Sequence, residues 1–581
     1  MEKDLIYSTH PEDFYYMDVN VPCQAACPAA TNIPAYIRAL FEGRYDESYS
    51  INLMANILPG VLGRICSRPC EGRCRHGEPG LGRPVNICHI KRAASDLRPQ
   101  TAHPKEGPFA SLAKKIAVVG SGPAGLAAAC DLSTLGFSVT LFEAFGKPGG
   151  MLRYGIPEFR LPRRVLDQEV ERILQAGVTL QAGVRVGRDV GTDDLLGSFD
   201  AVLLAAGCYR SIPLNIPGEG LQGVFPGLEF MMGVCVGEAP SVGKKVLVIG
   251  AGFTAFDCAR SAVRLGAEDV TICLRRTEED LVVTKDEIHE TKTEGVKIRS
   301  LMLSRRVMGE GRAEGVEFVR TRPGPRRSDG KTEVSPIEGS EFVVPADSVV
   351  VATGQRPEPM EFPARKSDQG IPLADKESFS TSLRGLYIAG DYLTGPSTVI
   401  EAIGMGRRAA ERIARDLTGR AFRERVVRMQ DTVITDRKRT WDFLPRQEIP
   451  TIRPLEERFR SGRLEVETGL SPEQAGEESK RCYLCYLHYE IDLSRCIYCR
   501  YCIDVAPRDC IKLVQEVKTN EVGAITGLVE TQIWRNVHAI VIDNSRCIRC
   551  GECVRVCPVN CISVTKVELT ERKVGEGRAD V

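Results

Sequence analysis

The sequence predicts a multidomain protein in which an α/β centre lies between two cysteine-rich ends. Two observations carry this prediction. The order strand, glycine-rich turn, helix and strand occurs twice between residues 115 and 274, and most of the cysteines lie before residue 89 or after residue 481. A chain of 581 residues also exceeds what one hydrophobic core supports, so we expect three or more domains.

The first repeat starts with the apolar run Lys115–Val119 and enters Gly120-Ser-Gly122-Pro-Ala-Gly125 before an alanine-rich helix. In such a turn the first glycine allows the tight bend, the second lets the backbone approach a pyrophosphate, and the third lets helix and strand pack closely. A glycine turn alone is weak support for a ligand. Here the second strand ends at Glu143, where an acid can bind ribose hydroxyls, so the repeat predicts a Rossmann-like unit for an adenosine dinucleotide.

The second repeat runs from Lys245-Val-Leu-Val-Ile through Gly250-Ala-Gly252-Phe-Thr-Ala255 to a strand that ends at Leu274-Arg275-Arg276. This strand has no acid at the ribose position. Two guanidinium groups there suit a 2′-phosphate, so the pattern favours NADP(H), with NAD(H) as the alternative. The competing interpretation is that both arginines cap a helix or face solvent.

The 22 cysteines are the main anomaly of the composition. Five of them, between residues 130 and 273, are isolated and are expected to be small buried hydrophobic residues.

The composition is otherwise balanced, with 77 basic and 77 acidic residues, so neither a nucleic acid nor an anionic membrane is indicated as a partner. Met1–Tyr16 contains no apolar run, and no segment reads as a membrane span, so we expect a cytoplasmic protein whose cysteines bind metal rather than form disulfides.

The last cysteines resemble a bacterial two-cluster ferredoxin: Cys496-x-x-Cys499-x-x-Cys502 and Cys547-x-x-Cys550-x-x-Cys553-x-x-x-Cys557-Pro558. In that family three thiolates come from a tight loop and the fourth comes from the other half of the domain. Zinc is the alternative metal for these cysteines, but zinc sites use pairs of cysteines rather than triplets.

The first half departs from this pattern, because Ala506-Pro507 stands where Cys-Pro is expected. The cluster of Cys496, Cys499 and Cys502 still gains Cys557, whereas the other cluster loses its usual fourth ligand. Cys510 and Cys561 occupy equivalent places, and both are common packing cysteines. A recruited cysteine, a non-cysteine ligand and a three-iron cluster all remain open at this point.

Four segments of the α/β centre are distinctive: Gly149-Gly-Met-Leu-Arg-Tyr-Gly-Ile-Pro-Glu-Phe-Arg-Leu-Pro162, Gly250-Ala-Gly-Phe-Thr-Ala-Phe-Asp257, Leu386-Tyr-Ile-Ala-Gly-Asp391 and Ser397-Thr-Val-Ile-Glu-Ala-Ile-Gly404. With these segments the chain resembles the glutamate synthase small-subunit family, and the resemblance covers about residues 20–420. It implies FAD in the first site and NADPH in the second. The expected FAD-binding residues are Gly120, Gly122, Pro123, Ala124, Gly125, Glu143, Gly150, Arg153, Gly390, Asp391, Thr398 and Val399. The expected NADP-binding residues are Gly250, Gly252, Phe253, Thr254, Ala255, Arg275 and Arg276.

The first cysteines, Cys23-x-x-x-Cys27-Pro and Cys66-x-x-x-Cys70-x-x-x-Cys74 followed by Cys88, resemble the N-terminal cluster domain of the same family. Members usually carry a further Cys-x-x-Cys pair just before the first of these, and it is missing here. We hypothesise that Cys482 and Cys485 replace it. Family topology then implies one cluster on Cys23, Cys74, Cys482 and Cys485, and a second on Cys27, Cys66, Cys70 and Cys88. The alternative is that Cys482 and Cys485 form a loose pair or belong to the terminal module.

The resemblances imply a helical N-terminal domain and a C-terminal α+β ferredoxin-like domain around two Rossmann-like domains. The expected boundaries are 1–110 for the iron–sulfur domain, 111–240 with 355–420 for the FAD domain, 241–354 for the NAD(P)H domain, 421–480 for a linker and 481–581 for the ferredoxin domain.

The expected function is electron transfer between NAD(P)H, FAD and up to four 4Fe–4S clusters, to or from a partner oxidoreductase subunit. FAD would carry the redox chemistry, so no catalytic side chain is expected. One alternative is a stand-alone NADPH:ferredoxin oxidoreductase, with or without electron bifurcation. Another is a redox-inert, metal-stabilised scaffold.

Overall fold

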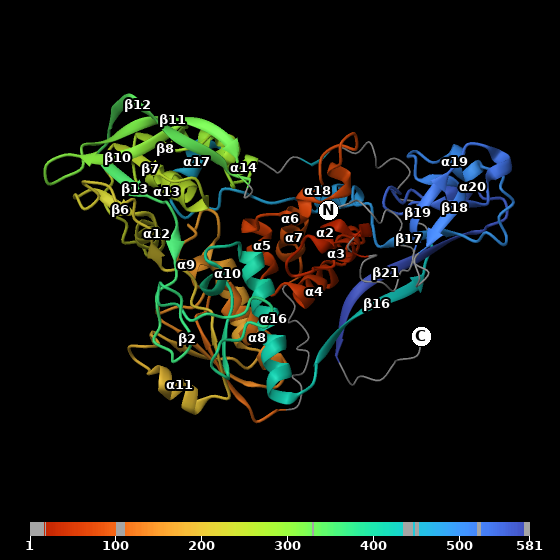
Figure 1. Cartoon of the computed structure of the whole chain (residues 1–581), viewed down its shortest axis with the longest axis horizontal. Helices are drawn as coiled ribbons and strands as arrows, with labels where there is room; N and C mark the ends of the chain where they lie inside the picture. Colours follow the sequence, from red (N-terminus) through yellow and green to blue (C-terminus); the bar gives the residue numbers. More distant parts are fainter. Residues whose placement is uncertain are drawn as a thin grey trace. The chain divides into compact units, whose positions relative to one another are not determined.

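The computed structural model describes residues 17, 19–99, 111–327, 330–433, 446–447, 453–519 and 525–573 (Figure 1). The opening stretch Met1–Tyr16 lies outside these residues. The chain divides into two compact units: one contains Lys105–Leu417 and Thr451–Thr468, and the other contains Met1–Pro104, Thr418–Pro450 and Gly469–Val581. Among the described helices, none is both long and apolar enough to cross a bilayer.

The first nucleotide fold is a five-stranded parallel sheet in the order β15-β4-β1-β2-β3. Its strands are β1 (Lys115–Val119), β2 (Ser138–Glu143), β3 (Thr179–Ala182), β4 (Ala201–Leu204) and β15 (Leu386–Ile388). β4 is buried along its whole length, as expected for a strand covered on both faces. The accompanying helices are α8 (Pro123–Thr134), α9 (Met151–Tyr154), α10 (Arg163–Leu174), α11 (Thr192–Ser198), α15 (Asp391–Thr394) and α16 (Val399–Thr418).

The second nucleotide fold repeats this topology in the order β6-β13-β7-β8-β9. Its strands and helices are β6 (Val224–Pro226), β7 (Lys245–Ile249), β8 (Asp269–Cys273), β9 (Lys297–Arg299), β13 (Ser348–Val351), α12 (Gly227–Val236), α13 (Phe253–Arg264), the short η2 (Glu278–Asp280) and α14 (Lys285–Thr293). Phe230 and Met231 of α12 pack in its hydrophobic core. The expected boundary at residue 241 therefore falls after β6 and α12, which belong to this fold.

An antiparallel sheet extends the second fold, and a short ribbon accompanies it. The sheet contains β10 (Met302–Met308), β11 (Gly315–Arg326) and β12 (Thr332–Pro345), and the ribbon pairs β5 (Arg210–Ser211) with β14 (Gln355–Arg356). The short helix α17 (Leu455–Arg458) also belongs to this unit.

Short helices form the first part of the other unit (Figure 1). They are α2 (Pro22–Ala25), α3 (Ile33–Phe41), α4 (Tyr45–Ala55), α5 (Pro59–Ile65), α6 (Pro69–Gly72), η1 (Arg75–Gly77) and α7 (Ile87–Asp96). Proline in the first turn begins α2, α3, α5 and α6, where its missing N–H costs nothing.

Two three-stranded sheets form the last part of this unit, in the orders β16-β21-β17 and β19-β18-β20. The elements are β16 (Arg423–Asp431), α18 (Pro472–Lys480), β17 (Leu487–Ile491), α19 (Tyr501–Asp504), β18 (Ile511–Thr519), β19 (Ile525–Glu530), η5 (Trp534–Asn536), β20 (Ala539–Ile542), α20 (Glu552–Val556) and β21 (Ile562–Lys573). The expected linker 421–480 thus contains a strand: β16 pairs with β21 along its full length, side by side in Figure 1.

Candidate functional site

The first glycine turn joins β1 to α8 and leaves open space where a phosphate would lie. Gly120 has a φ of +102°, and a Cβ there would meet the Ala205 oxygen at 2.5 Å. A Cβ on Gly125 would lie 1.8 Å from the Gly120 oxygen, whereas a Cβ on Gly122 would meet no atom within 4 Å. The outer glycines are therefore needed for close packing of the backbone. The middle glycine leaves space in which a ligand phosphate could approach the backbone at the N-terminus of α8.

Glu143 ends β2 beside this turn, as the sequence predicted. Its carboxylate accepts hydrogen bonds from the backbone N–H of Ser121 (3.1 Å) and of Phe145 (2.8 Å), and it also bonds the Ser121 hydroxyl. The side chain is only 4% exposed. These contacts fix the acid next to the glycine turn, where a ribose would lie.

The segment around Asp391 packs against helix α8, which follows the first glycine turn. A Cβ on Gly390 would meet the Ala124 side chain at 2.6 Å, so the loop before α15 can approach α8 only with glycine there. Asp391 accepts from the Ser397 hydroxyl (2.6 Å) and backbone N–H (3.2 Å), and burial raises the pKa of its carboxyl. Thr398 donates to Glu401 (2.8 Å) just before α16 begins at Val399.

Two other expected FAD residues have structural roles around α9. Gly150 has a φ of +54°, and a Cβ there would meet the Gly122 Cα at 2.7 Å. Arg153 donates to the Pro148 carbonyl (2.6 Å) and forms an ion pair with Asp167. Arg153 therefore holds the loop that carries Gly150 beside the glycine turn.

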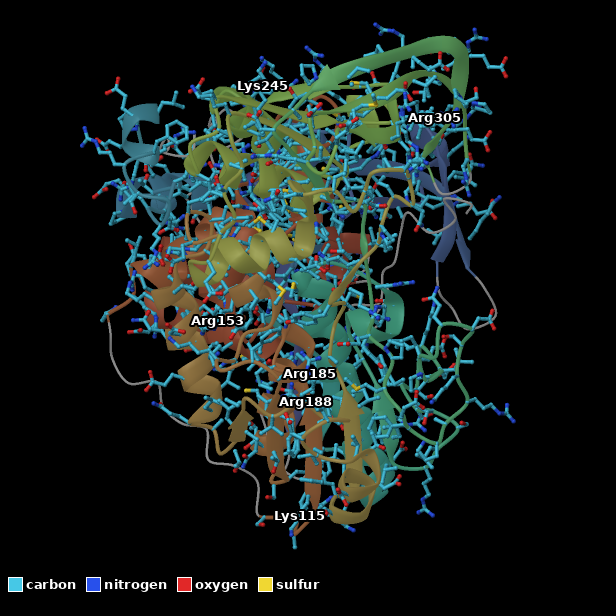
Figure 2. The ribbon with its side chains drawn as sticks, turned by 90° about the vertical axis from the view of Figure 1, so that its left-hand side faces the viewer. Lys115, Arg153, Arg185, Arg188, Lys245 and Arg305 are labelled. Carbon is cyan, nitrogen blue, oxygen red and sulfur yellow. The ribbon has the colours of Figure 1, made fainter. Side chains whose placement is uncertain are left out.

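The second glycine turn has the same design. A Cβ on Gly250 would meet the Ala352 oxygen at 2.3 Å, whereas a Cβ on Gly252 would meet nothing within 4 Å. Figure 2 labels Lys115 and Lys245, the first residues of the equivalent strands β1 and β7. Phe253, Thr254 and Ala255 open helix α13 directly after the turn.

The two arginines after β8 differ in their surroundings. Arg275 is largely exposed. Its pKa is lowered, first because part of the side chain is buried and second because the positive charge of Arg276 is adjacent. Arg276 donates through Nε to the Thr332 carbonyl (2.7 Å). Arg275 is therefore the better placed of the two for an anion, while Arg276 also anchors the hairpin of β11 and β12.

A buried ion pair that sequence reasoning missed connects the two nucleotide folds. Arg160, from the segment before α10, donates to both oxygens of Asp257 on α13 (2.8 and 2.9 Å). Asp257 is 3% exposed, and burial raises its pKa while Arg160 opposes that rise. Both residues lie in the segments that carry the family resemblance, which is the only sequence signal that could have found them.

The thiols of Cys23, Cys74, Cys482 and Cys485 gather at one place, although they come from opposite ends of the chain. Burial raises the pKa of the Cys23 thiol, and the neighbouring Cys485, Cys74 and Cys482 thiols raise it further. Burial likewise raises the pKa of Cys74 to about 12. The structure therefore brings together the four residues that we grouped from the sequence.

A second group contains Cys27, Cys66, Cys70 and Cys88 around Lys91. Cys88 lies within hydrogen-bonding distance of Cys66 and Cys70. Lys91 on α7 is 3% exposed, and although burial alone would lower its pKa, the four thiols around it raise the pKa. An ammonium group beside four thiols offsets the negative charge that thiolate ligands would bring.

The last cysteines form two further groups. Cys496, Cys499, Cys502 and Cys557 line one small apolar cavity, together with Cys561. Cys547, Cys550 and Cys553 form the other, and Cys553 also lies near Cys502 of the Cys496 group. Among the described residues, no group of three or more His, Cys, Asp or Glu side chains is placed so that it could hold a single metal ion.

A repeated backbone feature marks four of the cysteine loops. Arg68, Leu484, Tyr498 and Arg549 each follow a cysteine by two positions and have φ between 51° and 61°. In three of the loops the N–H of this residue donates to that cysteine sulfur at 3.4 Å. A positive φ outside glycine is strained, and strain of this kind is concentrated at functional sites. N–H donors aimed at sulfur suit thiolates that bind an iron–sulfur cluster.

Two buried arginines connect the groups. Arg481 is 1% exposed, pairs with Glu478 (2.7 Å) and donates to the carbonyls of Pro84 (3.1 Å) and Arg83 (2.5 Å). This fixes the Cys482–Cys485 loop against the N-terminal domain. Arg549 donates to the Leu487 (3.1 Å) and Cys485 (3.3 Å) carbonyls and to that of Cys547, so it links the Cys23 group to the Cys547 group.

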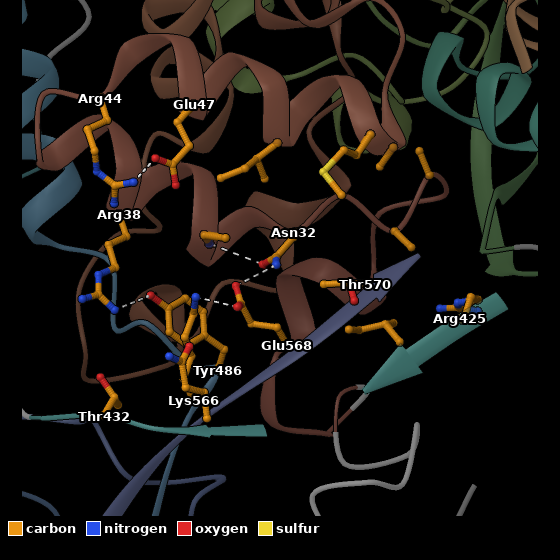
Figure 3. A pocket seen from close by; sticks show the side chains of 18 residues that line it. Asn32, Arg38, Arg44, Glu47, Arg425, Thr432, Tyr486, Lys566, Glu568 and Thr570 are labelled. Atoms are coloured by element: carbon orange, nitrogen blue, oxygen red, sulfur yellow. Dashed lines mark hydrogen bonds and ion pairs between the residues drawn. The ribbon is translucent and has the colours of Figure 1, made fainter. Parts of the chain in front are cut away.

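A cavity of about 510 Å³ lies beside these groups but contains none of the predicted cofactor residues (Figure 3). In Figure 3 Arg38 donates to the Tyr486 hydroxyl (3.5 Å), and Asn32 donates to Glu568 (3.2 Å). Charged side chains from α3, α4 and β21 face it. Its lining is polar, with charged side chains from three elements, and it includes neither of the two glycine turns.

Comparisons with known proteins agree with this geometry. Residues 114–406 match the model of the family described as pyridine nucleotide-disulphide oxidoreductase. The chain belongs to this family. Residues 18–102 match the family described as dihydropyrimidine dehydrogenase domain II, 4Fe–4S cluster, and residues 495–567 match the 4Fe–4S dicluster domain. The predicted combination of a nucleotide-dependent oxidoreductase with two iron–sulfur regions is thereby confirmed.

Three curated relatives of this oxidoreductase are each 36% identical to it. The NADPH-Fe(3+) oxidoreductase subunit beta of Geobacter sulfurreducens matches over 80% of this chain and 75% of its own length. The NADP(+)-dependent formate dehydrogenase subunit beta of Moorella thermoacetica matches over 81% and 71%. The glutamate synthase [NADPH] small chain of Escherichia coli matches over 57% and 74%. The predicted membership of the glutamate synthase small-subunit family is confirmed, and the chain is a flavin and iron–sulfur dependent NAD(P)H:acceptor oxidoreductase.

Proposed function

We propose that this oxidoreductase is an electron-transfer subunit that takes two electrons from NADPH and delivers them singly, through four clusters, to a partner enzyme. FAD supplies the exchange between two-electron and one-electron chemistry. The relatives include beta subunits of NADPH-dependent and NADP-dependent enzymes, which supports both the nucleotide and the partner.

One observation carries the proposal: a single chain contains two glycine turns with open middle positions and several gathered groups of buried cysteines. The open positions at Gly122 and Gly252 fit two pyrophosphates at two helix N-termini. We assign FAD to the first, with Glu143 and Asp391 holding ribose and ribityl hydroxyls, and NADPH to the second, with Arg275 facing the 2′-phosphate.

The contacts between the cysteine groups support an order for the clusters. Arg549 bonds the carbonyls of both Cys485 and Cys547, so the N-terminal group precedes the Cys547 group. Cys553 lies near Cys502, so the Cys496 group comes last. We assign as ligands Cys23, Cys74, Cys482 and Cys485; Cys27, Cys66, Cys70 and Cys88; Cys496, Cys499, Cys502 and Cys557; and Cys547, Cys550 and Cys553.

The loop of the last group has exposed apolar side chains that suit transfer to a partner. Ile497 is 59% exposed and Tyr501 is 55% exposed, on either side of Cys499. Exposed apolar residues beside a cluster favour short-lived docking of a second redox protein. A free ferredoxin would also fit this surface, so a stand-alone NADPH:ferredoxin oxidoreductase is the second candidate.

The decisive experiment is anaerobic isolation of the full chain from its native host, with flavin, iron and co-eluting polypeptides counted. About one FAD, close to sixteen irons and a stoichiometric second polypeptide would support the subunit proposal. The same cofactors without a partner, together with rapid reduction of ferredoxin by NADPH, would support the stand-alone enzyme. A colourless protein without iron would contradict both.

A second experiment tests the shared N-terminal cluster. We expect the double variant Cys482→Ser/Cys485→Ser to lose about four irons per chain and to keep its FAD. Cys130→Ser is the matched control, because Cys130 lies on α8 of the first nucleotide fold and belongs to none of the cysteine groups that we assign. An unchanged iron count in the double variant would show that the pair does not belong to a cluster.

A further inference from the structure

The internal symmetry of the terminal module identifies a cysteine for the position that the sequence left open. Its two halves repeat the same local structure. The Asp492 N–H donates to the Cys561 carbonyl (2.8 Å), and the Cys496 N–H donates to the Asp492 carbonyl (3.0 Å). In the other half the Asp543 N–H donates to the Cys510 carbonyl (2.7 Å), and the Cys547 N–H donates to the Asp543 carbonyl (2.9 Å).

The strands extend this equivalence. β17 pairs with β21 through Ile491 and Ile562, which follows Cys561. β18 pairs with β20 through Ile511, which follows Cys510, and Ile542. Cys510 therefore has the same position beside the Cys547 loop that Cys561 has beside the Cys496 loop.

The two halves differ in how many thiols they offer. The Cys496 loop has both Cys557, which is the expected fourth ligand, and Cys561, whose sulfur lies 3.5 Å from that of Cys557. The Cys547 loop has Ala506 where the equivalent of Cys557 would be. The Cys510 thiol, 5% exposed, lies within hydrogen-bonding distance of Cys547 and close to Cys550 and Cys553. It completes a set of four sulfur atoms.

We propose that Cys510 is the fourth thiolate ligand of the cluster held by Cys547, Cys550 and Cys553. The inference rests on the proposed function, because it assumes that this group holds a cluster. On binding, the Cys510 thiol releases its proton and a sulfur–iron bond replaces the S–H bond, with no transfer of electrons. The cluster is then a complete four-iron cluster between the N-terminal group and the Cys496 group.

The test uses the full chain, reconstituted anaerobically, with iron analysis and electron paramagnetic resonance of the oxidised protein. Oxidised four-iron clusters of this type are diamagnetic, whereas oxidised three-iron clusters give a signal. We expect no three-iron signal in the wild type. Cys510→Ala should lose about one iron per chain and gain a three-iron signal, and the matched variant Cys561→Ala should do neither.

A second measurement uses the unmodified sequence and so does not depend on how the variant folds. Alkylation of the native holoprotein, followed by mass spectrometry, should leave Cys510 unmodified until the iron is chelated. Any one of three results would overturn this inference without affecting the proposed function. They are alkylation of Cys510 in the holoprotein, a full iron count in Cys510→Ala, and a three-iron signal in the wild type. A terminal module that takes up no iron would overturn the proposed function with it.

Discussion

The substitution of the middle glycine of the first turn separates cofactor binding from folding. Gly122→Ala places a methyl group where no protein atom lies within 4 Å, on a residue with a φ of −70° that any amino acid adopts. Because Gly122 is the N-cap of α8, where alanine is less favourable than glycine, the free energy of unfolding should fall by no more than about 1 kcal/mol. The methyl group would stand where the FAD pyrophosphate approaches the backbone. Loss of one charge-assisted hydrogen bond costs about 1.5–3 kcal/mol, which is at least a tenfold weaker affinity for FAD.

The neighbouring glycine should behave in the opposite way. A Cβ on Gly125 would lie 1.8 Å from the Gly120 oxygen, so the backbone must move, and Gly125→Ala should cost about 1–3 kcal/mol or more even without FAD. Gly197→Ala on helix α11 is the control, because its Cβ meets nothing and alanine favours a helix. Flavin fluorescence titration and urea unfolding of the apoproteins measure the two effects. Wild-type FAD affinity in Gly122→Ala would refute the assignment of the pyrophosphate to this turn.

Three further outcomes follow from the charged residues. Arg481→Met leaves Glu478 buried without its ion-pair partner and should destabilise its unit by about 3–5 kcal/mol in urea unfolding, whereas Arg481→Met/Glu478→Gln should recover part of this loss. Arg275→Glu should weaken NADPH binding at least about tenfold and affect NADH binding less, as measured by stopped-flow reduction of the flavin. Equal effects on the two nucleotides would contradict the assignment of Arg275 to the 2′-phosphate. Lys91→Met removes a positive charge beside four cysteines, so the reduction potential of the cluster that we assign to them should fall by about 60 mV or more in a redox titration. An unchanged potential would show that the cluster does not lie beside Lys91.

Local patterns made the nucleotide folds and the cysteine loops predictable. The glycines at 120, 122 and 125 have physical roles that depend on their immediate neighbours, so spacing alone located the turn. The grouping of Cys482 with Cys23 came from a missing pair in a known pattern, and the structure brings these thiols together.

Contacts between distant segments were not predictable in the same way. Arg160 and Asp257 are charged residues of the kind that usually face solvent, and only tertiary structure shows that they pair in a buried place. The strand β16 lies in a charged segment whose side chains show no alternation of apolar and polar residues, because its partner β21 rather than its own pattern holds it in a sheet. The choice of Cys510 over other ligands likewise depends on strand pairing that the spacing of cysteines does not reveal.

The meeting of Cys23 and Cys74 with Cys482 and Cys485 has a consequence for how the protein is made. Roughly 460 residues separate the first of these cysteines from the last, and a ribosome adding about 5–20 residues per second needs on the order of 20–90 s to span them. The nucleotide folds, which lie between, can form during that interval. The thiols of Cys23 and Cys74 therefore remain without their two later partners, and exposed to oxidants and other metals, until Cys482 and Cys485 have been synthesised. Under the proposed function, iron can therefore be delivered to this group only late in synthesis. A chain that stops before residue 482 would then bind its flavin while that first group of thiols stays incomplete.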